Sequence, residues 1–186
     1  MKIYALFGVT CVGKSTIGSL LSDRLGCNFY DMDEEIKRYY GDTLNNIYAD
    51  CMYPRDKDEK KAKMFSHMLA LCREKGRDAV IAVSPMYHYV TFRNLITQYK
   101  VIAIELQDTA ENIAKRMIDT DDNDELIEES PYSNRENLSD ARYFITRYKK
   151  TFAHFPTKYR IDGKTAQQAA VEMEELIRNL PAEVEA

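Results

Sequence analysis

A short glycine-containing segment near the N-terminus constrains this chain more than any other feature. Residues 8–15 read Gly-Val-Thr-Cys-Val-Gly-Lys-Ser, which matches the G-x-x-x-x-G-K-[ST] pattern of a phosphate-binding loop. Residues 2–7 before it, mostly aliphatic and aromatic, predict a buried strand, and apolar residues at helical spacing after it predict a helix that ends at Gly26. By chance the pattern is expected in about one chain in a hundred of this size. The flanking strand and helix lower that figure, so the segment predicts nucleotide binding.

The residue types in this loop explain how it would hold a phosphate chain. Gly8 and Gly13 let successive backbone N–H groups point inward, and the helix that starts near Lys14 adds further N–H donors. We expect Lys14 to face solvent until nucleotide binds and then to reach the β- and γ-phosphates, and the Ser15 hydroxyl to ligate Mg²⁺. The residues predicted to bind the nucleotide in this loop are Gly8, Cys11, Val12, Gly13, Lys14, Ser15 and Thr16.

Length and charge restrict the class of protein further. A chain of 186 residues suits one ordinary domain. The net charge of −4 gives no reason to expect nucleic acid or an anionic membrane as a partner, and no apolar run approaches the ~20 residues of a membrane span. The four cysteines have no paired metal spacing and are typical of a reduced protein. We therefore expect a cytoplasmic protein, a monomer or weak dimer, without nucleic-acid or membrane partners.

Short apolar strands alternate with amphipathic helices to the end of the chain, which predicts an α/β fold. The expected architecture is a P-loop three-layer sandwich: a five-stranded, mostly parallel sheet with helices on both faces and ligands at the carboxyl ends of the strands. Pro54 is expected to break the helical pattern, ahead of a helix face at 64–72. The strands are expected at 2–7, 28–30, 79–83, 101–106 and 159–161.

Several classes of phosphate-loop protein do not fit these residues. Regulatory GTPases need an Asn-Lys-x-Asp guanine reader, which the chain lacks, and transporter ATPases are longer and carry a signature loop. The usual acid after the third strand is missing, because Ser84-Pro85 follows it, and Glu105 is no better placed. Mg²⁺ still needs a carboxylate, and Asp31 and Asp33, at the end of the second strand, are the best supply.

Residues 1–41 carry a resemblance to a known family. Residues 8–16 and 29–36, the latter reading Phe-Tyr-Asp-Met-Asp-Glu-Glu-Ile, resemble shikimate kinase, within the nucleoside-monophosphate-kinase-like fold. The resemblance implies ATP as phosphoryl donor, Mg²⁺ as cofactor and a small hydroxylated acceptor. It implies that Asp31 organises the metal, while Asp33 binds the acceptor hydroxyl and is the candidate base.

The same resemblance divides the chain and assigns roles to three arginines. It implies one kinase domain over 1–186, with an acceptor-binding excursion at about 32–75 and a lid at about 118–136. Arg55, followed by Asp58, resembles the family's substrate-binding arginine, and Arg147 could be a second one. Arg116 resembles the arginine that stacks on adenine.

Two segments depart from the family pattern. Ser84-Pro85-Met86 stands where the family has three glycines, and we expect the Pro85 and Met86 side chains to fill space there and make shikimate a poor acceptor. An acidic run at 119–129 occupies the lid, with Arg135 as its nearest base, where the family has an arginine that approaches the phosphates. Two other functions stay open: a nucleoside or nucleotide kinase, and a catalytically degenerate nucleotide-binding regulatory protein.

Overall fold

The sheet has the predicted form. The computed structural model describes residues 1–117 and 134–180, and its sheet has five strands in the order β2-β3-β1-β4-β5. Every neighbouring pair is parallel, which confirms the predicted α/β sheet. The strands are β1 (Ile3–Phe7), β2 (Asn28–Asp31), β3 (Ala79–Ala82), β4 (Ile102–Gln107) and β5 (Thr157–Arg160).

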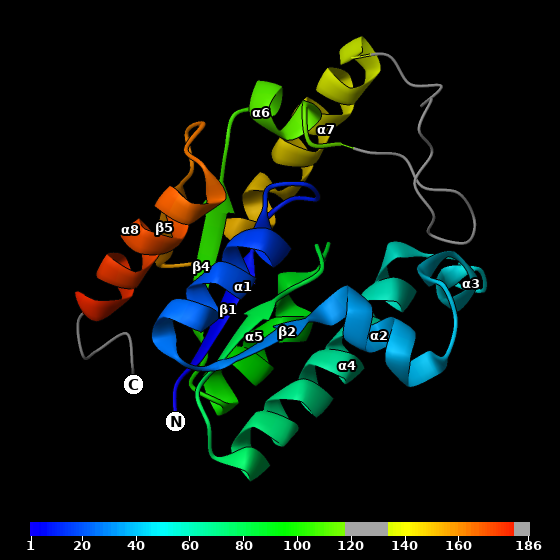
Figure 1. The fold of residues 1–186 in the computed structure, drawn as a ribbon. Coiled ribbons are helices and arrows are strands. Elements are labelled where there is room, and N and C mark those ends of the chain that lie inside the picture. The colour runs from blue at the N-terminus through cyan, green and yellow to red at the C-terminus, as the bar shows by residue number, and fades with distance from the viewer. Residues whose placement is uncertain (118–133, 181–186) are drawn as a thin grey trace.

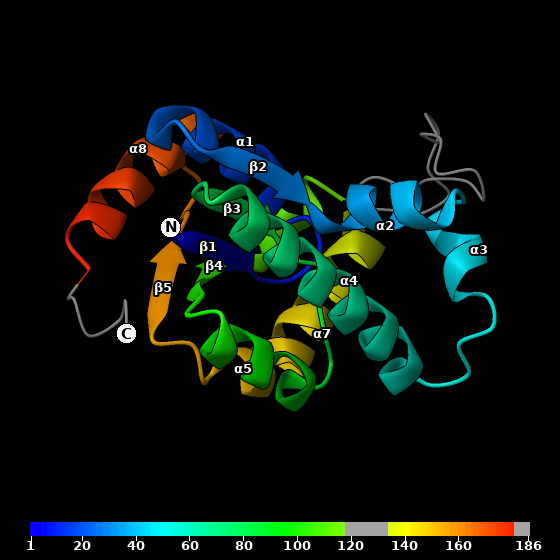
Figure 2. The ribbon, with the colours of Figure 1, turned by 90° about the horizontal axis from the view of Figure 1, so that it is seen from below.

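Helices cover both faces of this sheet and make the three predicted layers (Figure 1). Figure 2 shows α1 and α8 together on one face, and α5 and α7 on the other, with α4 next to α5. The short α6 connects β4 to the segment before α7. These helices are α1 (Lys14–Leu25), α4 (Pro54–Lys75), α5 (Tyr89–Gln98), α6 (Ala110–Ala114), α7 (Asn134–Phe152) and α8 (Ala166–Arg178).

The central strand β1 carries the phosphate loop on its carboxyl end. All its residues are buried, as expected of a parallel strand covered on both faces. At its end, the Phe7 ring lies 6.4 Å from the Phe65 ring of α4 and 4.4 Å from the Phe155 ring, measured between centroids. The loop therefore starts from a buried strand end that packs against two aromatic rings.

The predicted acceptor-binding excursion, about 32–75, comprises α2 (Met32–Tyr40), α3 (Leu44–Tyr48) and α4, and its helices α2 and α3 lie beyond the β2 edge of the sheet (Figure 1). The expectation that Pro54 breaks the helical pattern is wrong, because Pro54 is the first residue of α4. Proline suits that position, where a backbone N–H has no partner inside the helix. The Asp56 carboxylate accepts a hydrogen bond from Tyr53 N at 3.0 Å and so caps the same turn.

The predicted lid lies mostly outside the described residues. Residues 118–133 contain its acidic run, and the described part of the lid is limited to residues 134–136, where Arg135 lies on the first turn of α7. The division into excursion and lid therefore stays a prediction. Within residues 1–117 and 134–180, no helix has both the length and the apolarity needed to cross a membrane.

Candidate functional site

The phosphate loop has a backbone that only its glycines allow. Gly8 has a φ of 146° and Gly13 a φ of 109°, both outside the range that side chains favour. A Cβ on Gly8 would also lie 2.7 Å from the Leu106 carbonyl oxygen of β4 and 2.9 Å from a Val12 methyl carbon. The first glycine is therefore required both by its conformation and by the approach of the loop to β4.

Lys14 is held inside this loop. Its side chain is half-buried, and Nζ donates hydrogen bonds to the carbonyl oxygens of Gly8 at 3.1 Å and Val9 at 2.9 Å. The expectation that Lys14 faces solvent is wrong, since an ammonium with three donors takes the nearest carbonyls when it loses water. Burial lowers the pKa of Lys14 to about 8, although the Asp33 carboxylate acts in the opposite direction.

A cavity of about 380 Å³ opens above the loop, at the carboxyl ends of β2 and β3. It brings the predicted metal ligands Ser15 and Asp31 together with the predicted base Asp33 and with Arg116. The full lining is Thr10, Cys11, Gly13, Lys14, Ser15, Thr16, Asp31, Asp33, Ala82, Val83, Ser84, Pro85 and Arg116. One cavity is thus lined by most of the residues predicted to bind the nucleotide, and by Ser84 and Pro85 from the segment that departs from the family pattern.

The two aspartates have different surroundings. Asp31 caps α2, and its Oδ1 accepts hydrogen bonds from Asp33 N at 3.0 Å and Glu34 N at 3.4 Å. The Asp33 carboxylate accepts a hydrogen bond from the Ser84 hydroxyl. Met86, in contrast, is fully buried in the core and does not line the cavity, so the expectation that its side chain fills acceptor space is wrong.

These residues fit a magnesium ion. In the described part of the chain, no group of three or more His, Cys, Asp or Glu side chains could hold a metal without help. Mg²⁺ does not need such a group, because it usually takes one or two carboxylates together with substrate phosphates and water. The Ser15 hydroxyl and the Asp31 carboxylate, in the wall of one cavity, supply ligands of this kind.

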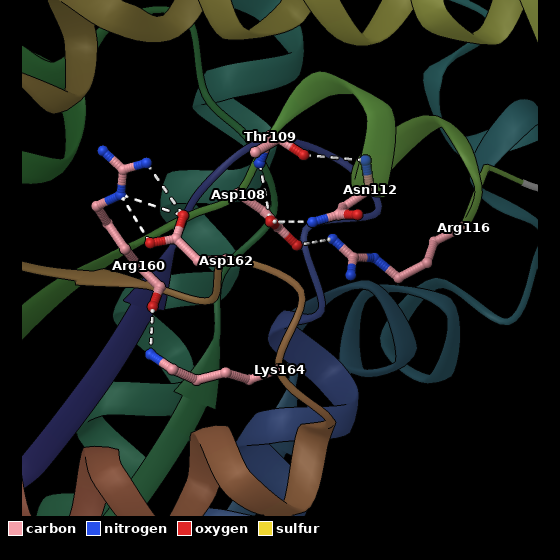
Figure 3. Close-up of polar contacts among 7 residues, drawn as sticks. All are labelled: Asp108, Thr109, Asn112, Arg116, Arg160, Asp162 and Lys164. Carbon is pink, nitrogen blue, oxygen red and sulfur yellow. Dashed lines mark hydrogen bonds and ion pairs between the residues drawn. The ribbon is translucent and has the colours of Figure 1, made fainter.

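Arg116 is fixed against the phosphate loop by a buried acid that sequence reasoning missed (Figure 3). Its Nε donates to the Cys11 carbonyl oxygen at 3.0 Å, and its guanidinium lies 2.6 Å from Asp108 Oδ2. The Asp108 side chain is 0% exposed, and its Oδ1 accepts from Thr109 N at 2.8 Å and Asn112 Nδ2 at 2.9 Å. The available signal was an acid just after β4, followed by a helix-capping threonine.

The loop after β5 lies near Asp108 at the carboxyl edge of the sheet (Figure 3). Asp162 and Gly163 both have left-handed backbones, with φ values of 49° and 78°. Arg160 pairs with Asp162 at 3.0 Å, and Lys164 Nζ donates to the Arg160 carbonyl oxygen at 3.3 Å.

The two remaining arginines lie outside the cavity lining. Arg55 is 75% exposed and pairs with Glu59, one turn further along α4, at 3.0 Å. The guanidinium carbon of Arg147 lies 5.1 Å from the centroid of the Tyr87 ring, a cation–π contact. Their acceptor-binding roles stay predictions.

Asp58 connects α4 to the segment that forms the cavity wall. It is fully buried, and its Oδ2 accepts hydrogen bonds from Tyr87 N at 2.9 Å and His88 N at 2.8 Å, and lies 3.0 Å from His88 Nδ1. The family resemblance associates this acid with Arg55, but here it holds the loop between β3 and α5. The sequence signal was an acid among the apolar positions of α4.

We predict that loss of this carboxylate destabilises the protein. Asp58→Ala leaves two part-buried N–H donors without their acceptor, and we expect a fall of about 3 kcal/mol in the free energy of unfolding. Asp58→Asn keeps one acceptor oxygen and should lose less. Urea denaturation measures both, with the exposed neighbour Glu59→Ala as control, expected within about 0.5 kcal/mol of the wild type. Equal stabilities for Asp58→Ala and Glu59→Ala would contradict the prediction.

A second cavity, of about 390 Å³, lies between β4, β5 and α7. Glu105 lines it, nearly buried, and pairs with Lys158 at 2.9 Å. Glu105 is therefore part of this second cavity and is not in the wall of the phosphate cavity, which agrees with the expectation that it is no substitute for the missing acid.

Comparison with known proteins gives a consistent result. The family model for shikimate kinase matches residues 10–176. A shikimate kinase from Aquifex aeolicus is 50% identical over 48 residues, 26% of this chain and 28% of that protein. One from Bacillus licheniformis is 23% identical over 180 residues, 95% of this chain and 94% of that protein.

Solved structures give the same fold. A shikimate kinase from Acinetobacter baumannii, in complex with shikimate, superposes with a TM-score of 0.72 at 18% sequence identity. The superposition covers 97% of this chain and 95% of that one. At this identity the likeness supports the fold.

Proposed function

This chain belongs to the shikimate kinase family, and from that premise we propose that it transfers the γ-phosphoryl group of ATP to a hydroxyl of a small acceptor. The observation that carries the proposal is the single cavity in which Lys14, Ser15, Asp31 and Asp33 meet. Phosphoryl transfer depends chiefly on positioning and charge neutralisation, and this cavity offers a cation, metal ligands and a carboxylate for both tasks.

The donor side of the site is the phosphate loop. Its N–H groups and Lys14 bind the β- and γ-phosphates, which replace the two carbonyl partners of the lysine. Ser15 and Asp31 would hold Mg²⁺, which when bound neutralises charge on the phosphate oxygens. One carboxylate oxygen of Asp31 accepts the hydrogen bond that caps α2. This hydrogen bond orients the Asp31 carboxylate toward the cavity that it lines.

The acceptor side is centred on Asp33. Its carboxylate orients the acceptor hydroxyl and takes the hydroxyl proton as the oxygen attacks phosphorus. The Ser84 hydroxyl, which donates to this carboxylate, fixes its rotamer. Because Ser84 and Pro85 form the wall where the family has bare backbone, we propose a small hydroxylated acceptor other than shikimate as the better substrate.

A panel of acceptors tests this function. ADP formation is measured with shikimate, other cyclic hydroxy acids, neutral polyols and nucleosides, each with Mg²⁺ and ATP. The proposal expects acceptor-dependent turnover with a cyclic hydroxy compound. Turnover only with nucleosides would support the nucleoside kinase alternative, and ATP binding without acceptor-dependent turnover would support a regulatory protein.

Arg116 gives a prediction for the nucleotide side. If its guanidinium packs against the adenine, Arg116→Ala should raise the KM for ATP several-fold with little change in kcat, since stacking stabilises ground and transition states equally. Steady-state kinetics with saturating acceptor measure both constants. Arg142→Ala, which removes an exposed guanidinium paired with Glu111 on the neighbouring α6, is the control. A fall in kcat at unchanged KM would instead place Arg116 at the transferring phosphoryl group.

A further inference from the structure

Cys11 gives the phosphate loop a left-handed residue that is not a glycine. Its φ is 60°, a conformation that residues with a side chain adopt only rarely. Such a conformation persists where the surrounding contacts hold it. Cys11 lines the phosphate cavity, between the two glycines that open and close the turn of the loop. The contacts made by Cys11 therefore help to set the shape of the loop.

The backbone of Cys11 is held by the Arg116 side chain, whose Nε donates to the Cys11 carbonyl oxygen at 3.0 Å. In the trans peptide that joins Cys11 to Val12, the C=O and N–H bonds point in opposite directions. Holding the carbonyl toward Arg116 therefore turns the Val12 N–H the other way, where it donates to the Val9 carbonyl oxygen at 3.4 Å. The same Val9 oxygen accepts a hydrogen bond from Lys14 Nζ at 2.9 Å. Arg116 thus fixes the direction of an N–H group that shares its acceptor with the loop lysine.

Asp108 in turn fixes Arg116, and it uses both of its oxygens (Figure 3). Oδ2 accepts from Arg116 Nη2 at 2.6 Å, while Oδ1 is held by Asn112 Nδ2 and by the backbone N–H of Thr109. Burial acts to raise the pKa of Asp108, but the hydrogen bonds from Asn112 and Arg116 lower it. The carboxylate is therefore charged at neutral pH, and it is anchored to the start of α6 on the side away from Arg116.

These contacts leave the faces of the Arg116 guanidinium free for a second role. Both hydrogen bonds, from Nε and Nη2, lie in the plane of the group. The side chain is 37% exposed and lines the phosphate cavity. An adenine base can pack against the guanidinium face while its edge holds the loop. The two roles are compatible, and an experiment has to separate them.

We propose that Asp108 is a positioning residue for the nucleotide: through Arg116, it holds the peptide between Cys11 and Val12 in the orientation that the phosphates require. Among the described residues that line the phosphate cavity, Arg116 is present and Asp108 is not. Asp108 therefore acts through the arginine. The inference rests on the nucleotide-binding part of the proposed function and involves no acceptor and no turnover.

The charge of Asp108 makes the proposal testable by the sign of an effect. A carboxylate near the loop repels phosphate groups, so loss of its charge alone would tighten phosphate binding. Asp108→Asn removes the charge, keeps the size of the side chain and weakens the hold on Arg116. Positioning therefore predicts weaker phosphate binding in this variant, and simple electrostatics predicts stronger binding.

The experiment compares a ligand that has a base with one that has none. Calorimetry measures the Kd of Mg-ATP and of magnesium tripolyphosphate for the wild type and for Asp108→Asn. We expect both Kd values to rise about 10-fold and by the same factor, the loss typical of one hydrogen bond. Glu111→Gln removes an exposed acid of α6 that pairs with Arg142, and it is the control. Its Kd values should stay within about twofold of the wild type.

A double-mutant cycle tests whether Asp108 acts through Arg116. If it does, the variant with both Asp108→Asn and Arg116→Ala should bind tripolyphosphate as weakly as Arg116→Ala alone. Circular dichroism and urea denaturation establish that each variant is folded at the temperature of the titration. If Asp108→Asn is not folded, Asp108→Ser replaces it, and the same signs are expected.

Three results would overturn the proposal. Unchanged or tighter tripolyphosphate binding by folded Asp108→Asn would show that the acid does not shape the loop. Weaker binding of Mg-ATP alone would restrict Asp108 to the support of adenine packing, and losses that add in the double variant would show that it acts independently of Arg116. A wild type that binds Mg-ATP but phosphorylates no acceptor would refute the proposed transfer, whereas the Kd comparison would still decide the role of Asp108.

Discussion

Lys14→Ala is expected to lower kcat/KM for phosphoryl transfer by about 10³-fold, near the upper end for removal of one transition-state donor. The lysine is the cation of the phosphate loop, and its charge balances the β- and γ-phosphates as negative charge moves between them. Coupled measurement of ADP formation gives kcat and KM. Lys115→Ala, an exposed lysine near the same edge of the sheet, is the matched control and should behave as the wild type.

The pH dependence of ATP affinity distinguishes the effect of the Lys14 charge from the effect of the size of its side chain. Because burial lowers the pKa of Lys14 to about 8, the free loop loses its positive charge as the pH rises through that value. ATP affinity of the wild type should therefore fall above pH 8, while that of Lys14→Ala should stay flat over this range. Wild-type turnover by Lys14→Ala at any pH in this range would remove the basis of the proposed function.

Asp33→Asn is expected to reduce transfer by roughly 10²- to 10⁴-fold, the usual contribution of a general base, and to leave ATP affinity nearly unchanged. The amide keeps the size of the carboxylate and can still accept the hydrogen bond from Ser84, but it cannot take the acceptor proton. Single-turnover kinetics measure the chemical step, and calorimetry measures the Kd of Mg-ATP.

The effect of Asp33→Asn is interpreted by comparison with that of Asp31→Asn. Its predicted role is with the metal, so it should raise the Mg²⁺ concentration needed for half-maximal turnover and weaken Mg-ATP binding. Equal losses of Mg-ATP affinity in both variants would show that the two aspartates do not divide donor and acceptor roles. Ser84→Ala, which leaves the Asp33 carboxylate in place, should reduce turnover much less than Asp33→Asn.

The parts of the fold that depend on neighbouring residues were predictable from the sequence. The glycine spacing of the loop identified its conformation, and Gly26 marked the end of α1. The order of strands and helices gave the parallel sheet. Pro54 was misread because proline both breaks a helix and opens one, and only the packing of α4 decides between these.

The parts that depend on distant contacts were not predictable. Lys14 bonds to carbonyls of its own loop, whose direction is set by the approach of β4 to Gly8. The role of Asp58 depends on where α4 meets the segment after β3, residues far apart in the sequence. The sequence pattern assigned no role to Asp108, whose carboxylate accepts a hydrogen bond from the Arg116 guanidinium at 2.6 Å.

The central position of β1 has a consequence for how the chain acquires its activity during synthesis. β1 is the first strand to leave the ribosome, yet its sheet partners are β3 and β4, which end at residues 82 and 107. The edge strand β2 likewise cannot pair until β3, its partner in the sheet, has been synthesised. Such long-range parallel pairing makes folding slow compared with helical proteins. The nucleotide loop is therefore among the first segments translated but one of the later ones to take its working shape, and nascent chains shorter than about half the protein would have no means of binding ATP through it.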